Sequence, residues 1–179
     1  MPPVRSYHHG NLRVTLLAHA EQVLAEGGEL SLRELARRAG VSHAAARRHF
    51  PDKQELLDAL ALDGFRRLRA QLDVALASED PMLAWAQTYV HFATEHAALL
   101  DLMYTGKHAP GASPFLAEAA DRTFNSALGL FESERSAMVT FATFHGLAAM
   151  INGGMLAVDD VDELVADAVA QIRRGLVVS

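Results

Sequence analysis

Residues 30–50 read LSLRELARRAGVSHAAARRHF and are the most informative part of the chain. They contain two short helical patterns separated by Ala39-Gly40-Val41. Glycine permits a sharp backbone turn, and Leu35, Ala36 and Val41 are spaced to pack the two helices together. We therefore expect a helix-turn-helix, with helices over residues 32–39 and 42–49.

The second helix of this motif is polar and basic. No large apolar residue occurs between Val41 and Phe50, so the helix has little apolar surface to bury. Its alanines at positions 44, 45 and 46 allow a close approach to another surface, and its arginines are long enough to reach phosphates or base edges in a DNA major groove. A solvated basic helix without a partner has the same composition, and charge alone does not distinguish the two interpretations.

The charge of the chain is segregated along its length. The net charge of the whole chain is −6, which by itself argues against a nucleic-acid partner. The distribution of the charge along the chain changes this conclusion. Residues 1–70 contain 11 Lys and Arg against 8 Asp and Glu, a balance of +3, whereas the remaining 109 residues contain 5 against 14, a balance of −9. This asymmetry indicates an N-terminal end that faces nucleic acid and a second region with another task.

The rest of the sequence also has helical patterns. Apolar residues recur at helical spacing, and Gly, Pro, Ser and Asp mark the interruptions. We expect helices over residues 12–26, 32–39, 42–49, 53–78, 81–96, 97–104, 114–131, 134–152 and 160–176. Ser31 with Glu34 and Asp52 with Glu55 have the spacing of capping boxes. No strand pattern competes, so the prediction is an all-α fold of about nine helices.

Three motifs together resemble a known family. Tyr7-His-His-Gly-Asn-Leu-Arg13, LSLRELARRAGVSH over residues 30–43 and RHFPDKQELL over residues 48–57 closely resemble the DNA-binding region of TetR-family transcriptional regulators. The match covers about residues 7–66. It implies a helix-turn-helix DNA-binding domain over residues 1–52 and a ligand-binding and dimerisation domain over residues 53–179. The helix over residues 53–78 is then the connector.

The family pattern, transferred position by position, implies two groups of DNA contacts. Backbone contacts are expected from Arg33, Arg47, His49 and Lys53, and groove-facing positions are Ser42, His43, Ala44 and Arg48. The chain departs from the family at Ala46-Arg47, where Leu-Tyr or Pro-Tyr is usual. Because an arginine can keep a phosphate contact and add a charge to it, we expect DNA binding to be retained with a different operator preference.

The C-terminal region offers surface for a second copy of the chain. The last two long helices, residues 134–152 and 160–176, have more apolar surface than one small bundle hides, which favours a homodimer. A twofold dimer places two recognition helices about 34–36 Å apart and predicts a roughly palindromic operator. Phe144-His145-Gly146-Leu147 also resembles the Trp-His-Gly segment of one subgroup of TetR-like C-terminal domains, with phenylalanine in place of tryptophan.

The resemblance further implies a small-molecule effector, apolar or aromatic, bound between the C-terminal helices. Its candidate contacts are Trp85, Tyr89, Phe92, Met103, Tyr104, Phe124, Phe144 and His145. The alternative is that these residues simply form the core. The predicted function is a repressor of transcription that the effector releases from double-stranded DNA. The competing hypothesis is a helical small-molecule-binding protein whose DNA affinity was lost through the Ala46-Arg47 change.

Other classes of protein are disfavoured. The chain has no cysteine, which excludes disulfides, thiolate metal sites and cysteine nucleophiles. The most apolar stretch, residues 138–151, spans 14 residues and is too short for a membrane helix, and residues 1–10 lack the apolar segment of a signal peptide, so we expect a cytoplasmic protein. His91 and Glu95 share a helical face, but His96 lies about 500° around the helix from His91. We therefore expect no catalytic residues, no metal and no cofactor.

Overall fold

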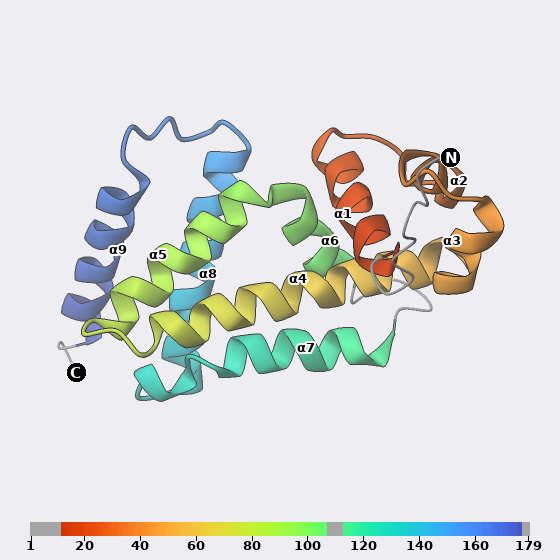
Figure 1. Cartoon of the computed structure of the whole chain (residues 1–179). Helices are drawn as coiled ribbons and strands as arrows, with labels where there is room; N and C mark the ends of the chain where they lie inside the picture. Colours follow the sequence, from red (N-terminus) through yellow and green to blue (C-terminus); the bar gives the residue numbers. More distant parts are fainter. Residues whose placement is uncertain (1–11, 107–112, 177–179) are drawn as a thin grey trace, which may run out of the picture.

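The computed structural model describes residues 12–106 and 113–176, and these residues form nine α-helices and one 3₁₀ helix without any strand (Figure 1). The elements are α1 (Leu12–Ala25), α2 (Leu32–Arg38), α3 (His43–His49), α4 (Lys53–Ala75), α5 (Pro81–Glu95), α6 (Ala97–Gly106), α7 (Pro114–Asn125), η1 (Leu128–Leu130), α8 (Glu134–Asn152) and α9 (Val161–Leu176). The all-α prediction is confirmed. None of the helices in the described ranges has the length and apolar character that a membrane span requires.

The long helix α4 connects the two ends of the molecule (Figure 1). α1, α2 and α3 lie together at one end of it, and α9 lies at the opposite end beside α5. α4 packs against α5, α6 and α7, and α1 packs against both α4 and α6. The N-terminal helices are therefore attached to the rest of the molecule through α4 and α6.

Several helices begin where a short polar side chain accepts a hydrogen bond from a free backbone amide. Ser42 accepts from the amide of Ala45 at 3.1 Å. Asp52 accepts from the amide of Glu55 at 2.9 Å. This confirms one of the two hydrogen bonds of the second predicted capping box, the one to the N-cap side chain. These caps separate α3 from α4 even though only three residues lie between them.

The first predicted capping box is wrong. Ser31 precedes α2 in an extended conformation but makes no side-chain cap. The Glu34 carboxylate accepts instead from Arg37 at 2.6 Å and from Arg38 at 3.2 Å. Because these two arginines follow Glu34 on the same helix, its carboxylate is directed away from the N-terminus of α2.

The helix predicted over residues 114–131 is also too long. α7 ends at Asn125, and Leu128–Leu130 form the separate 3₁₀ helix. The Ser126 hydroxyl donates to the carbonyl of Thr123 at 2.7 Å, and the Thr123 hydroxyl donates to the carbonyl of Ala119 at 2.8 Å. The Ser126 hydroxyl thus occupies the Thr123 carbonyl, and the amide of Ala127 donates to the carbonyl of Phe124 at 3.4 Å, so the regular α-helical pattern stops there.

The hydrophobic core is continuous from α1 to α9. Leu35 and Phe50 from the N-terminal helices belong to the same buried cluster as Leu56 and Leu60 at the start of α4. Gly64 lets α6 approach α4 closely, since a Cβ at this position would lie 2.6 Å from the sulfur of Met103. The proposed domain boundary at residue 52 thus lies between elements that share a core, and the division itself stays a prediction.

Candidate functional site

The helix-turn-helix exposes one face of α3. Gly40 has a φ of +67°, the left-handed conformation that favours glycine, and the amide of Val41 donates to the carbonyl of Ala36 at 2.9 Å to close the turn. Ala46 and Phe50 are 0% and 1% exposed. Because these two residues fix the inner side of α3 against the core, the opposite side is left free.

The residues predicted to face the groove lie on that free side. The exposed residues are Ser42, His43, Ala44, Arg47 and Arg48, and His49 is half-buried. The expectation for Ala46 is wrong: its methyl group lies in the core and cannot ease an approach to DNA. Ala44 keeps that role available because it is exposed.

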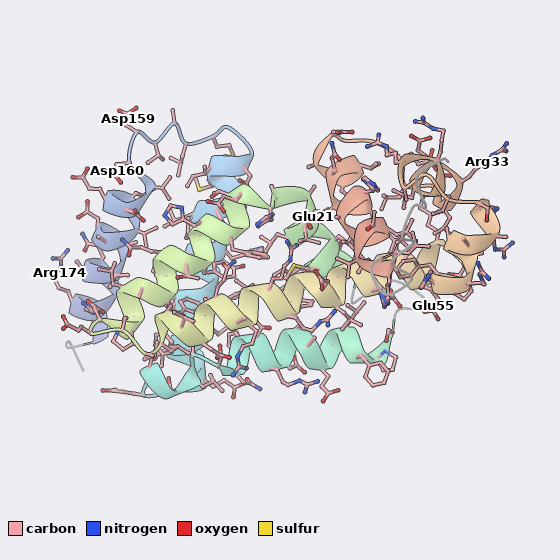
Figure 2. The ribbon with its side chains drawn as sticks, viewed as in Figure 1. Glu21, Arg33, Glu55, Asp159, Asp160 and Arg174 are labelled. Carbon is pink, nitrogen blue, oxygen red and sulfur yellow. The ribbon has the colours of Figure 1, made fainter. Side chains whose placement is uncertain are left out.

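The arginines of the motif differ in how far carboxylates already neutralise them. Arg37 and Arg38 both bind Glu34, and hydrogen bonds from them lower the pKa of its carboxyl to about 2. Within residues 12–106 and 113–176, neither Arg33 nor Arg48 forms an ion pair. Figure 2 shows Arg33 at the outer edge of the end that contains α1, α2 and α3. These two guanidinium groups are available to an anionic partner.

Two further predicted contacts lie where α3 meets α4. Arg47 donates through Nε to the carbonyl of Pro51 at 3.2 Å, so its side chain is directed along the α3–α4 loop. Lys53 is half exposed, and its Nζ lies 3.7 Å from the carboxylate of Glu29, a distance that makes a weak surface pair. Both residues therefore border the same end of α3, where a phosphate could reach them.

The aromatic residues predicted as effector contacts form one cluster inside the C-terminal helices. Trp85 stacks on Tyr89 with ring centroids 5.7 Å apart and meets Phe144 edge to face at 6.2 Å. Tyr104 lies 5.4 Å from the ring of His145. Phe124 joins the cluster through Phe141, whose ring centroid lies 5.7 Å from its own. Six of the eight predicted residues therefore belong to this cluster.

Phe141 is the residue that sequence reasoning missed. Its ring contacts those of Tyr89, Tyr104, Phe124 and His145, at centroid distances of 5.2, 6.0, 5.7 and 5.7 Å. The signal was present, because Phe141 precedes His145 by four residues and so occupies the same face of a helix. Two predicted residues lie apart from the cluster: the ring of Phe92 packs on His96, and Met103 packs against Gly64.

The cluster contains buried polar groups. The Tyr89 hydroxyl and Nδ1 of His145 are joined by a hydrogen bond of 2.8 Å. Burial raises the pKa of Tyr89 well above its ordinary range and lowers the pKa of His145. The indole N–H of Trp85 is buried and has no hydrogen-bond partner in the part of the chain that the structure describes. A buried donor without an acceptor is costly, so this position favours a ligand atom or a water that accepts from it.

The histidines considered as metal ligands have separate partners. His91 pairs with Asp162 of α9 at 2.8 Å, and His96 pairs with Glu21 of α1 at 3.1 Å. Among the described residues no three His, Asp or Glu side chains are grouped so that they could hold a metal ion. Each imidazole instead links two helices.

A helix-turn-helix at one end of an all-helical fold, with a polar and basic exposed face on its second helix, is the architecture that helix-turn-helix DNA-binding proteins share. The family model for bacterial regulatory proteins of the tetR family matches residues 16–60. This match places the helix-turn-helix region of the chain in the tetR family of bacterial regulatory proteins. No match was found among curated proteins.

Solved structures with the same fold extend over nearly the whole chain. A Rhodococcus sp. RHA1 protein of unknown function is 46% identical, with a TM-score of 0.82, over 96% of this chain and 98% of its own. A TetR family transcription regulator from Marinobacter aquaeolei VT8 is 19% identical, with a TM-score of 0.68, over 87% and 92%. AibR in complex with isovaleryl coenzyme A and operator DNA is 18% identical, with a TM-score of 0.64, over 88% and 95%. The two more distant structures share the fold.

Proposed function

We propose that this chain is a cytoplasmic repressor that binds a palindromic operator as a homodimer and is released from it by a small apolar or aromatic effector. The observation that supports this most directly is the free side of α3, where exposed Ser42, His43 and Arg48 stand above a core anchored by Ala46 and Phe50. A helix held in this way can enter the major groove without unfolding its own packing.

The two groups of DNA contacts have different tasks. Arg33, Arg47, His49 and Lys53 bind phosphates, and Ser42, His43, Ala44 and Arg48 meet the base edges. Phosphate contacts give affinity for any sequence together with salt dependence, whereas base contacts give preference among sequences. Arg48, which lacks an ion pair among the described residues, is the side chain best suited to a guanine edge.

The homodimer forms through α8 and α9. The apolar side chains of Met138 and Val139 on α8 are 56% and 60% exposed, so they offer apolar surface to a partner. A groove of about 330 Å³ between α8 and α9 is lined in part by Val139 and Ile172. The apolar residues Val165 and Val169 of α9 are already buried in the monomer core. The exposed face of α8 and this groove therefore supply most of the surface for a second copy.

The effector binds at the aromatic cluster of α5, α6, α7 and α8. Tyr104, Phe124 and His145 are only partly buried, so this side of the cluster reaches the surface. The unpartnered indole N–H of Trp85 and the Tyr89–His145 pair offer polar groups to it. AibR, which has the same fold, is known with a ligand and operator DNA, which supports a ligand-responsive regulator. The effector regulates only through different affinities for the two arrangements of the helices.

Fluorescence anisotropy with the DNA upstream of the chain's own gene tests the proposal, at salt concentrations between about 50 and 200 mM. Lys53→Ala is expected to weaken binding to all sequences and to reduce the salt slope by about 1 unit. His43→Ala is expected to change the preference among sequences. Glu79→Gln, in the exposed loop between α4 and α5, is the control and is expected to change neither.

Two outcomes contradict the proposal. Equal effects of Lys53→Ala and His43→Ala across a panel of DNA sites would refute the division of tasks. Absence of any complex at low salt would refute the regulator itself, and would favour a helical small-molecule-binding protein that has lost DNA affinity.

A further inference from the structure

A second region of the molecule has the composition of a ligand site. A cleft of about 550 Å³ lies between α4 and α7, within the range typical of small-molecule sites. Its lining includes Arg13 from α1, Arg66 and Arg69 from α4, and Arg122 from α7. The aromatic cluster is not part of this lining.

Basic side chains outnumber acidic ones in the lining of the cleft. Four arginines line it against one carboxylate, Asp73. Arg13, Arg66 and Arg69 belong to the basic residues 1–70, whereas Arg122 comes from the acidic remainder of the chain and is brought beside them by the packing of α7 on α4. Anions, and not cations, are the ligands that such a site attracts.

The present contacts of the arginines show which of them a ligand can use. Arg69 donates to Asp73 at 2.6 Å and to the backbone carbonyl of Arg122 at 2.7 Å, so it holds α4 and α7 together. Among the described residues, highly exposed Arg66 and Arg122 pair only within their own helices, with half-buried Asp63 and exposed Glu118, each at 3.1 Å. Exposed pairs of this kind contribute little, and their guanidinium groups can turn to a new carboxylate at small cost.

The rest of the lining is apolar. Leu62 and the buried ring of Phe65 form part of the wall on α4. Phe115 of α7 also lines the cleft and is 62% exposed, which is unusual for a side chain of this size. An apolar chain lying against these residues would cover Phe115 and leave its own end among the arginines.

We propose that this cleft binds an amphiphilic anion, an apolar chain that ends in a carboxylate. Arg66 and Arg122 bind the carboxylate, while Leu62, Phe65 and Phe115 contact the chain. The assignment of a ligand stands without the proposed function, but its regulatory consequence rests on it. Because Arg13 belongs to the same helix that packs the DNA-binding end onto α4, a ligand in this cleft biases the position of that end.

Isothermal titration calorimetry of the full chain with decanoate, below its micelle concentration, tests the assignment. We expect one site per chain, and about a tenfold weaker dissociation constant in Arg66→Gln and in Arg122→Gln. Phe115→Ala is expected to weaken decanoate binding as well. The matched control is Arg174→Gln, which removes an exposed arginine of α9 and is expected to leave the dissociation constant unchanged. Decanol, which has the same chain and no charge, is expected to bind more weakly and to be insensitive to the arginine substitutions.

The assignment is overturned if decanoate does not bind, if decanol binds equally well, or if Arg174→Gln weakens binding as much as Arg66→Gln. The anisotropy assay with upstream DNA separates this result from the proposed function. Arginine-dependent decanoate binding without any DNA complex leaves the cleft assigned and refutes the regulator. A DNA complex without decanoate binding supports the regulator and refutes the assignment of the cleft. Where both occur, decanoate is expected to change DNA affinity in the wild type and not in the variant with both Arg66 and Arg122 replaced by Gln.

Discussion

One carboxylate adds polar contacts to the apolar packing that holds the DNA-binding end on the rest of the molecule. Glu21 of α1 accepts from Arg67 of α4 at 2.9 Å and contacts the imidazole of His96 at 3.1 Å. These three side chains come from the N-terminal helices, the connector and the α5–α6 junction. Removing the charge with Glu21→Gln keeps the shape and volume of the side chain while weakening both contacts. We expect this variant to loosen α1 on α4.

The size of the effect follows from the exposure of the pair. The side chains of Glu21 and Arg67 are 23% and 36% exposed, so the pair is neither a surface ion pair nor a buried one. A value between those two limits, about 1 kcal/mol, is expected for the interaction. For a chain of this length that corresponds to a fall in Tm of about 2–4 °C, compared at one fixed protein concentration.

A double-mutant cycle isolates the pair. The free energy of urea unfolding is measured for the wild type, Glu21→Gln, Arg67→Met and the double variant. The contact of Glu21 with His96 and that of Arg67 with Asp63 are each lost in two arms of the cycle, so they cancel from the coupling energy. We expect a coupling of about 1 kcal/mol; a value below about 0.3 kcal/mol would mean that the pair does not help to hold α1 in place.

Three further predictions concern the core. Gly64→Ala is expected to lower the free energy of unfolding by about 1–3 kcal/mol, because its Cβ would lie 2.6 Å from the sulfur of buried Met103; an unchanged or higher urea midpoint would contradict this close packing. Burial lowers the pKa of His145 below 6.5, so the unfolded chain takes up this proton first and stability is lost as the pH falls from 6.5 through the folded-state pKa. Tm measured against pH is expected to show this loss in the wild type and less of it in His145→Gln. Burial raises the pKa of Tyr89 above 10.0, so stability is lost as the pH rises above that value; a Tyr89→Phe variant with the same alkaline profile would show that another group is responsible.

The helix-turn-helix could be predicted because its signals are local. A turn glycine and the apolar positions Leu35 and Val41 lie within a few residues of each other, and the structure uses Gly40 in the turn as expected. The failures are also local. The spacing of Ser31 and Glu34 predicts a hydrogen bond from the Ser31 amide to the Glu34 carboxylate. It does not indicate that Arg37 and Arg38 donate to this carboxylate instead.

The cleft between α4 and α7 could not be predicted in the same way. Its arginines are at positions 13, 66, 69 and 122, on three helices that only the tertiary packing brings together. In the sequence, Arg66 and Arg69 suggest no more than a solvated helix face, and Arg122 belongs to a region whose overall charge is negative. Burial is equally hard to infer: Ala46 and Ala44 are chemically identical, but only Ala46 lies in the core.

Selection of bound sequences from a random pool of double-stranded DNA tests the central claim, that the free side of α3 reads DNA in a twofold dimer. The wild type is compared with a variant in which Ser42, His43 and Arg48 are replaced by alanine; Ser42 is also the N-cap of α3, so circular dichroism must first show that the variant is folded. We predict that the wild type enriches a sequence with two symmetric half-sites whose centres are about one helical turn apart, or a multiple of it, and that the variant does not. Enrichment of no sequence by the wild type, or of the same sequence by the variant, would contradict the claim.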